Sequence, residues 1–174
     1  MKTETTKQLE KLLARHFDDR KDFYVFECTI GWYGREIVDC IKYTTDREIV
    51  CYEIKQSKAD FHSKHALTFI GNKNYFVMPY SLYEQVKNEI PYEIGVYVAI
   101  DHMEHKEGIR DDFGTPRRCQ WAEPVDGLKE LHCIKPARRR DLKADKEVIL
   151  SSMLRSMQRD RVLPILREGY VNHE

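Results

Sequence analysis

The sequence lacks the features expected of a membrane protein, an exported protein or a zinc-stabilised domain. Its longest uninterrupted apolar run covers only residues 96–100, whereas a helix that crosses a bilayer needs about 20 apolar residues. The first 24 residues carry charges throughout and contain no signal-peptide pattern. The five cysteines include no CxxC pair, so a structural zinc site is not expected. These absences predict a cytoplasmic protein that does not enter a membrane.

The chain also has no overall charge of one sign, because 29 basic residues balance 29 acidic ones. Net charge therefore gives no general attraction to a polyanion. Residues 135–161 differ from the rest, with nine basic and four acidic residues. A solvated face stabilised by ion pairs would explain this stretch. The other explanation is a polyanion-binding surface, and its contacts would be Arg138, Arg139, Arg140, Arg155 and Arg159.

The composition, with 41% hydrophobic and 33% charged residues, is that of one globular domain, and 174 residues suffice for a core. We predict a core over about residues 5–100, a polar excursion over 101–127 and a basic, helical C-terminal piece over 135–167. Meandering strands followed by crossover helices predict an α/β fold, a mixed sheet flanked by helices. Hydrophobic periodicity places helices over 5–17, 57–69, 81–88 and 144–162, and strands over 23–30, 37–43, 48–55, 75–78, 93–100 and 128–134, with a short strand near 119–121.

Two of these strands form a hairpin that brings ionisable residues together. The first strand contains Asp39, the second contains Glu53 and Lys55, and polar turn residues lie between them. If the hairpin is symmetric about Asp46, Asp39 lies directly opposite Glu53, roughly 5 Å away. Two carboxylates at that distance repel by about 3 kcal/mol at an effective dielectric near 20. A cation would remove this repulsion, so we expect Asp39, Glu53 and the Ile54 carbonyl to bind Mg²⁺ or Mn²⁺.

This arrangement depends on the register of the hairpin. A loop one residue longer or shorter would pair Asp39 with Tyr52 or Ile54 and would send the two carboxylates to opposite faces of the sheet. Asp39 and Glu53 would then be ordinary polar residues on a solvated face. The neighbouring residues argue against this alternative, because the faces that carry the two acids are largely apolar. Charges at the edge of an apolar face need a partner or a function.

The order of elements, together with Asp39 and the segment Glu53-Ile54-Lys55, resembles the PD-(D/E)XK nuclease superfamily. Its shared core is a helix, three antiparallel strands, a helix and another strand; the Asp begins the second strand and the E-x-K lies in the third. The segments 34–39, 52–61 and 74–79 are more specifically similar to proposed DNA-repair endonucleases of the MmcB type. Those have E-x-K-S, then S-x-x-D-F, then a Y-F-x-x-P strand. The resemblance covers about residues 20–140, although Val38 stands where the motif has Pro.

The resemblance implies a restriction-endonuclease-like fold and a metal-dependent nuclease that hydrolyses DNA phosphodiester bonds, in DNA repair, recombination or mobile-element biology. It implies that Asp39 and Glu53 hold the metal and that Lys55 orients or deprotonates the attacking water. It also implies a further acidic residue. Glu27, on the first strand, is preferred for this role over Glu10, on the first helix.

Residues that follow the E-x-K segment are expected to contact DNA. Gln56 is a candidate for the scissile phosphate, and Lys58 for the DNA backbone, although an exposed polar helix face explains Lys58 as well. Ser57 more simply caps the following helix. Cutting of both strands often uses a homodimer, but no residue of the sequence indicates one.

Two other classes of function compete with the nuclease. A non-catalytic nucleic-acid-binding or regulatory protein on the same fold has no need to keep all three charged residues of the motif, so we favour the enzyme. A zinc hydrolase would need histidine ligands, and such pairs are common by chance; the candidates are His62-x-x-His65 and His102-x-x-His105. The sequence therefore predicts a Mg²⁺-dependent DNA endonuclease.

Overall fold

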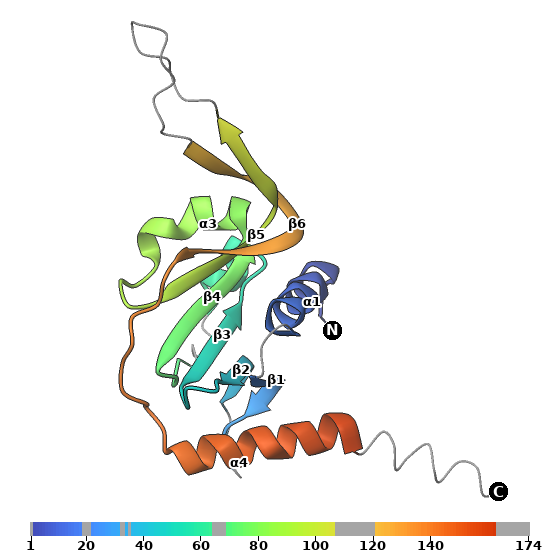
Figure 1. Cartoon of the computed structure of the whole chain (residues 1–174), viewed down its shortest axis with the longest axis vertical. Helices are drawn as coiled ribbons and strands as arrows, with labels where there is room; N and C mark the ends of the chain where they lie inside the picture. The colour runs from blue at the N-terminus through green and yellow to red at the C-terminus, as the bar shows by residue number, and fades with distance from the viewer. Residues whose placement is uncertain are drawn as a thin grey trace, which may run out of the picture.

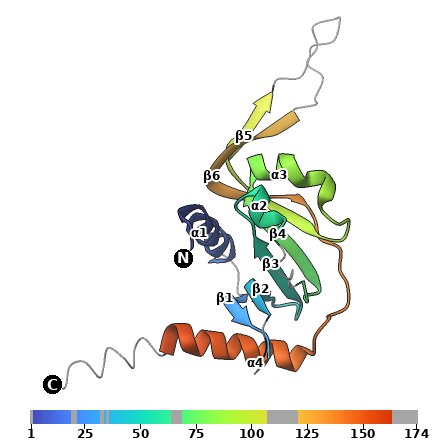
Figure 2. The same ribbon diagram turned by 180° about the vertical axis from the view of Figure 1, so that it is seen from behind.

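The computed structural model describes residues 2–18, 22–31, 34, 36–63, 69–106 and 121–162. Six strands form one sheet in the order β1-β2-β3-β4-β5-β6, with helices on both faces (Figures 1 and 2). The strands are β1 (Phe23–Thr29), β2 (Ile37–Tyr43), β3 (Ile49–Ile54), β4 (Lys73–Pro79), β5 (Gly95–Lys106) and β6 (Trp121–Lys135). The helices are α1 (Glu4–Asp18), α2 (Lys58–Phe61), α3 (Tyr80–Val86), η1 (Lys87–Glu89), α4 (Lys146–Met157) and η2 (Gln158–Val162).

The sheet is mixed, as the sequence predicts. β1, β2 and β3 form an antiparallel meander, and β3, β4 and β5 run parallel to one another. β6 then returns antiparallel to β5 as an edge strand. The α/β class and the flanking helices are therefore confirmed. No helix in the described part of the chain is long and apolar enough to cross a membrane.

One face of the sheet is covered by α1, because the apolar residues of this helix recur every three or four positions. Leu9, Leu13 and Phe17 are fully buried, and they pack in one cluster with Val50 and Tyr52 of β3. Burial of each such side chain contributes about 1.5–3 kcal/mol. The helix therefore fixes which face of β3 is directed toward it.

The opposite face is covered by α3 and α4. Phe76 of β4 packs in a cluster with Leu82 of α3, and Ile49 of β3 packs in another with Ile149 and Met153 of α4. Residues 50, 52 and 54 of β3 thus face α1, whereas residues 49 and 51 face α4. This alternation is the two-residue period of a strand buried on both faces.

The helix predicted over residues 57–69 is shorter in the structure. Ser57 caps it as expected, because its hydroxyl accepts a hydrogen bond from the Asp60 amide at 3.2 Å, but α2 ends at Phe61. Phe69 and Ile70 are not helical; they are buried in two different clusters of the core. The apolar residues that suggested a continued helix are therefore explained by their burial in the core. Residues 64–68 lie outside the described part.

The polar excursion predicted over residues 101–127 is wrong where the structure describes it. Residues 101–106 continue β5, and residues 121–127 begin β6, with His102 paired to Val125 and Glu104 to Glu123. The two strands form an arm that extends beyond the rest of the sheet (Figure 1). Antiparallel pairing satisfies the backbone of the arm without an apolar face, so its polar sequence resembles a loop. Residues 107–120 lie outside the described part.

The basic C-terminal piece, predicted as helical over 135–167, begins as an extended segment instead. Backbone amides of Arg138, Arg140 and Lys143 donate to carbonyls of Glu93, Asn72 and Ile70 at 2.9–3.2 Å. These bonds replace helical ones until Asp145, whose carboxylate caps α4 by accepting from the amides of Glu147 and Val148. The helix predicted over 144–162 is confirmed as α4 and η2, and residues 163–167 lie outside the described part.

We predict that two neighbouring substitutions on α4 will differ sharply in effect. Ile149 is fully buried against the sheet, whereas Val148 is 41% exposed. Ile149→Ala should lower the free energy of unfolding by about 2–5 kcal/mol, and Val148→Ala by about 0.5 kcal/mol or less. Urea denaturation followed by circular dichroism measures both, and equal losses would contradict this packing of α4.

Candidate functional site

The β2–β3 hairpin has the register that the sequence predicts. Cys40 pairs with Tyr52, and Tyr43 pairs with Ile49. Continuing this register by one residue places Asp39 opposite Glu53. The turn closes through a hydrogen bond from the Thr44 amide to the Glu48 carbonyl at 2.9 Å. The alternative registers, which would separate the two acids, are therefore excluded.

A row of three acidic residues crosses the sheet at this level. The β1–β2 register pairs Phe26 with Cys40 and Cys28 with Val38, and this places Glu27 opposite Asp39. Glu27 has a φ of 50°, a left-handed conformation that costs a non-glycine residue roughly 1–2 kcal/mol. Such a strained residue within a strand often belongs to a functional site.

Asp39 lies where β2 stops pairing with β3. Its carboxylate Oδ2 accepts a hydrogen bond from the backbone amide of Ile54 at 2.9 Å. On the other side of the strand, the next amide, of Lys55, donates to the Val77 carbonyl of β4 at 2.9 Å. The Asp39 side chain thus supplies the acceptor that the β2 backbone no longer provides, and it is held against the middle residue of Glu53-Ile54-Lys55.

The two charged residues on either side of Ile54 are buried. Glu53 and Lys55 are each 5% exposed. The charge of Glu53 contributes to the raised pKa of its neighbour Cys51, which burial brings to about 12. Burying ionised groups is unfavourable unless they are paired or have a function, so these positions are unusual for a purely structural strand.

Burial also raises the pKa of Asp39 above its ordinary value. The hydrogen bond from Ile54 and the positive charge of Lys55 oppose this shift, whereas the negative charges of Asp60 and Glu10 add to it. The charges of Asp60, Glu10 and Lys55 therefore act on Asp39. Glu53 and Lys55 adjoin Ile54 in the sequence. Negative charge is concentrated where water is partly excluded.

Of the two acids considered for the fourth position, Glu10 acts on Asp39 electrostatically. Glu27 has a side chain that is 54% exposed, and it pairs with Lys2 at 2.9 Å. Lys2 also pairs with Glu10 at 2.5 Å, so its ammonium group joins the two acids. Glu10 of α1 thus acts on Asp39, whereas the sequence analysis prefers Glu27, on the first strand, as the fourth acid.

Asp60 acts on Asp39 through its charge, and the sequence analysis gave it no such role. It lies in the first turn of α2, and its carboxylate accepts a hydrogen bond from the Gln56 amide at 3.1 Å. The motif S-x-x-D contained the signal, because an acid three residues after a capping Ser faces back toward the preceding strand. Gln56 itself is hydrogen-bonded to Thr3 through its side chain, and Lys58 is exposed.

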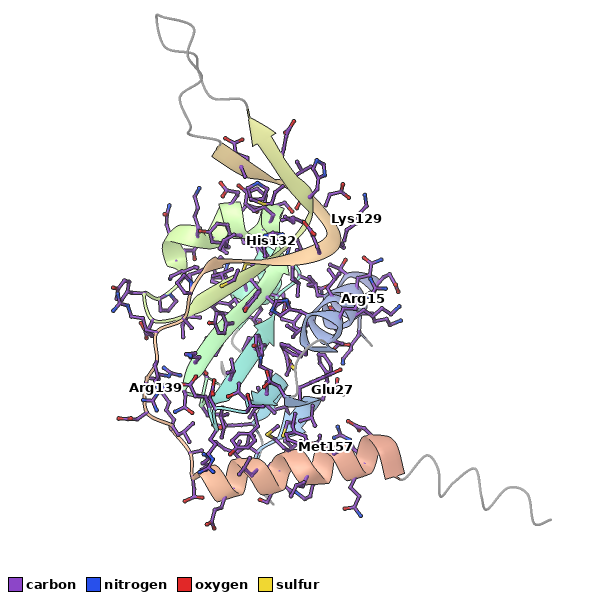
Figure 3. The ribbon with its side chains drawn as sticks, viewed as in Figure 1. Arg15, Glu27, Lys129, His132, Arg139 and Met157 are labelled. Atoms are coloured by element: carbon purple, nitrogen blue, oxygen red, sulfur yellow. The ribbon has the colours of Figure 1, made fainter. Side chains whose placement is uncertain are left out.

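The arginines of the basic stretch do not form one surface. Arg139 pairs with Glu48 at 3.0 Å, at the turn end of β3, about 17 Å along the strand from Glu53. In contrast, Arg159 donates to the Glu27 carbonyl at 3.4 Å. Figure 3 shows Arg139 toward the left and Glu27 toward the right of the sheet. Arg139 and Arg159 therefore lie apart, because Arg139 belongs to the extended segment before α4 and Arg159 follows α4.

The remaining arginines mostly contact backbone or aromatic groups. Arg155 donates to the Gly31 carbonyl at 2.7 Å, and Arg140 donates to the Phe69 carbonyl. The Arg138 guanidinium lies over the ring of Tyr92 at 4.1 Å. These contacts attach the C-terminal segments to the sheet, and they assign structural roles to side chains that the sequence assigned to polyanion binding.

The histidines considered as zinc ligands have other partners where the structure describes them. His62 contacts Glu89 at 2.6 Å, and His102 contacts Asp101 at 3.0 Å. The other member of each pair lies outside the described side chains. Among the described residues, no group of three or more His, Cys, Asp or Glu side chains is arranged to hold a metal ion.

Comparisons with known proteins give the fold but no activity. No family model matches the chain, and no curated protein matches it. A solved structure, of a protein of unknown function from Silicibacter pomeroyi, is similar with a TM-score of 0.64 and 16% sequence identity. The match covers 100% of this chain and 98% of the other. The whole chain thus shares its architecture with that protein.

The raised pKa of Asp39 predicts how stability depends on pH. The folded state retains the Asp39 proton more strongly than the unfolded chain does. The destabilisation is therefore absent below the ordinary pKa of 3.8 and develops as pH rises through the raised value. Asp39→Asn keeps an acceptor for the Ile54 amide and carries no charge. In EDTA it should melt at a higher temperature than the parent protein at pH 7 and at the same temperature near pH 3.

Thermal denaturation followed by circular dichroism measures this difference. Asp46→Asn is the matched control, because Asp46 is an exposed acid on the same hairpin. A melting temperature of Asp39→Asn that falls below that of the parent at pH 7 would show that the buried charge stabilises the fold.

Proposed function

We propose that the chain is a metal-dependent nuclease that hydrolyses DNA phosphodiester bonds as an endonuclease in DNA repair, recombination or mobile-element biology. The observation that carries the proposal is the contact of Asp39 with the Ile54 amide, between Glu53 and Lys55. It brings together the acid and the E-x-K segment that the PD-(D/E)XK resemblance requires. The element order α1, β1, β2, β3, α2, β4 supports a restriction-endonuclease-like fold.

The side chains at this end of β3 suit a hard divalent cation. Mg²⁺ and Mn²⁺ prefer oxygen ligands, and Mg²⁺ in enzymes is bound by one or two carboxylates, with waters and substrate oxygens as its other ligands. Asp39 and Glu53 supply the carboxylates, and the Ile54 carbonyl is the candidate third ligand. A pair of acids is thus enough, and a cluster of three is not needed. Such an ion polarises the phosphate and acidifies water.

The protein side chains then have distinct tasks. The Lys55 ammonium group carries positive charge next to Asp39, where it stabilises negative charge that develops on the phosphate and orients the attacking water. Glu10 is our candidate for the acid that accepts a hydrogen bond from that water, and Glu27 is the alternative. Gln56 and Lys58 follow the E-x-K segment directly and are the candidates for contacts with the DNA backbone.

We predict that substitutions at the site will abolish cleavage and leave DNA binding largely intact. Asp39→Asn, Glu53→Gln and Lys55→Met should each lower the rate of Mg²⁺-dependent plasmid cleavage by about 100-fold or more, because each removes a charge that acts on the reacting phosphate. Gel-based cleavage and fluorescence-anisotropy binding measure the two properties. Glu84→Gln and Lys87→Met are matched controls on exposed residues.

Glu10→Gln and Glu27→Gln separate the two candidates for the fourth acid. The larger loss of cleavage should occur in Glu10→Gln, because the charge of Glu10 is among the main causes that raise the pKa of Asp39. Parent protein that binds DNA and does not cut linear, branched, nicked or single-stranded DNA with Mg²⁺ or Mn²⁺ would support the non-catalytic alternative. Normal cleavage by Asp39→Asn or Glu53→Gln would show that the site is elsewhere.

A further inference from the structure

A second concave site lies on the α1 face of the sheet, away from the acids. It is a pocket of about 460 Å³, within the size range of small-ligand pockets. Glu53 lies on the opposite face of β3 from Val50 and Tyr52, which line this pocket. None of the residues proposed for catalysis lines the pocket. Its lining is Asp22, Lys42, Thr44, Thr45, Asp46, Glu48, Val50, Tyr52, Lys73, Tyr75 and Tyr97.

Three tyrosines contribute to one wall of this pocket; Tyr52 is 2% exposed, so the partly buried Tyr75 and Tyr97 supply the accessible ring surface. The rings of Tyr52 and Tyr75 are nearly parallel, with an interplanar angle of 16° and centroids 5.6 Å apart. Tyr97 completes the group, 5.0 Å from Tyr75. Flat aromatic ligands stack on such surfaces, and stacking of a base on an aromatic side chain contributes roughly 1–3 kcal/mol.

The opposite lining is polar and contains both donors and acceptors. Lys42 is buried and donates to Asp22 at 3.0 Å, and Lys73 donates to Glu48 at 2.6 Å. An ammonium group has three donors, so each lysine retains the capacity to bind a ligand atom. Glu48 and Asp46 add carboxylate acceptors. A flat ligand with donors and acceptors along its edge matches this lining, and a nucleobase has such an edge.

The balance of charge disfavours an anionic ligand. The pocket lining contains three carboxylates, of Asp22, Asp46 and Glu48, and two ammonium groups, of Lys42 and Lys73. A phosphate placed among them would meet a net negative charge. A cation is found instead beside the pocket, where Arg139 is 62% exposed in its side chain and pairs with Glu48 at 3.0 Å. A polynucleotide strand would place a base inside and a phosphate near Arg139.

We propose that this pocket binds a single nucleobase, presented as an unpaired base of a nucleic-acid strand. In that form the inference rests on the proposed function and extends it, because a base held here would fix the strand relative to the proposed catalytic residues at the end of β3. Base binding itself does not require cleavage or metal. A free nucleoside is the other source of the same chemistry, and the experiment distinguishes the two.

The test is saturation-transfer NMR with the four nucleosides in EDTA, combined with anisotropy titration of a single-stranded oligonucleotide. Base protons should receive saturation, and adenosine should bind more tightly than adenosine 5′-monophosphate. Lys73→Met should weaken nucleoside binding about tenfold, because a charged hydrogen-bond donor is lost. Lys87→Met is the matched control, since Lys87 also pairs with a glutamate, at 2.8 Å, but lies outside the pocket.

Each outcome decides between the sources or overturns the proposal. Weaker oligonucleotide binding in both Lys73→Met and Arg139→Ala, with nucleoside binding unchanged in Arg139→Ala, supports the strand. Loss of nucleoside binding with unchanged oligonucleotide affinity contradicts the strand and leaves a free-nucleoside site. Absence of transfer to every base, or equal binding by Lys73→Met and Lys87→Met, overturns the proposal. Asp39→Asn should bind bases normally, so failure of the nuclease proposal remains distinguishable.

Discussion

One side-chain hydrogen bond organises the candidate site. The backbone ladder between β2 and β3 extends to the pairing of Cys40 with Tyr52, and beyond it the Asp39 carboxylate accepts from the Ile54 amide. A buried amide without an acceptor would be costly, so this bond stabilises the end of β3. It also holds an acid beside Glu53 and Lys55. The same hydrogen bond therefore satisfies the Ile54 amide and positions the Asp39 carboxylate.

The electrostatics of this region oppose folding in the absence of a cation. Burial raises the pKa of Asp39, and the nearby charges of Asp60 and Glu10 raise it further, while Lys55 only partly compensates. Glu53 is almost completely buried. Sites that give up stability to hold destabilised charges are typical of catalytic and ion-binding centres. The rest of the sheet, with α1 on one face and α3 and α4 on the other, provides the stability that this arrangement requires.

The sequence predicts the part of the fold that depends on local signals. The helical period of α1 and the polar turn between Tyr43 and Ile49 are sufficient for the first helix and for the hairpin register. Prediction fails where distant contacts decide. Phe69 and Ile70, which the sequence places in a helix, are non-helical and buried in the core, and the paired arm resembles a loop because its sequence is mostly polar. Arg138, Arg139 and Arg140 lie in an extended segment held by backbone bonds to Glu93, Asn72 and Ile70, and no local pattern encodes that path.

The most direct test of the central claim is the location of Mn²⁺ by anomalous diffraction in crystals soaked with the ion. The account predicts one strong peak within about 2.0–2.3 Å of carboxylate oxygens of both Asp39 and Glu53, and no such peak in crystals of Asp39→Asn. A saturating soak that leaves no peak between these two residues, or a peak that persists in Asp39→Asn, would contradict the assignment of this end of β3 as a metal-dependent catalytic site.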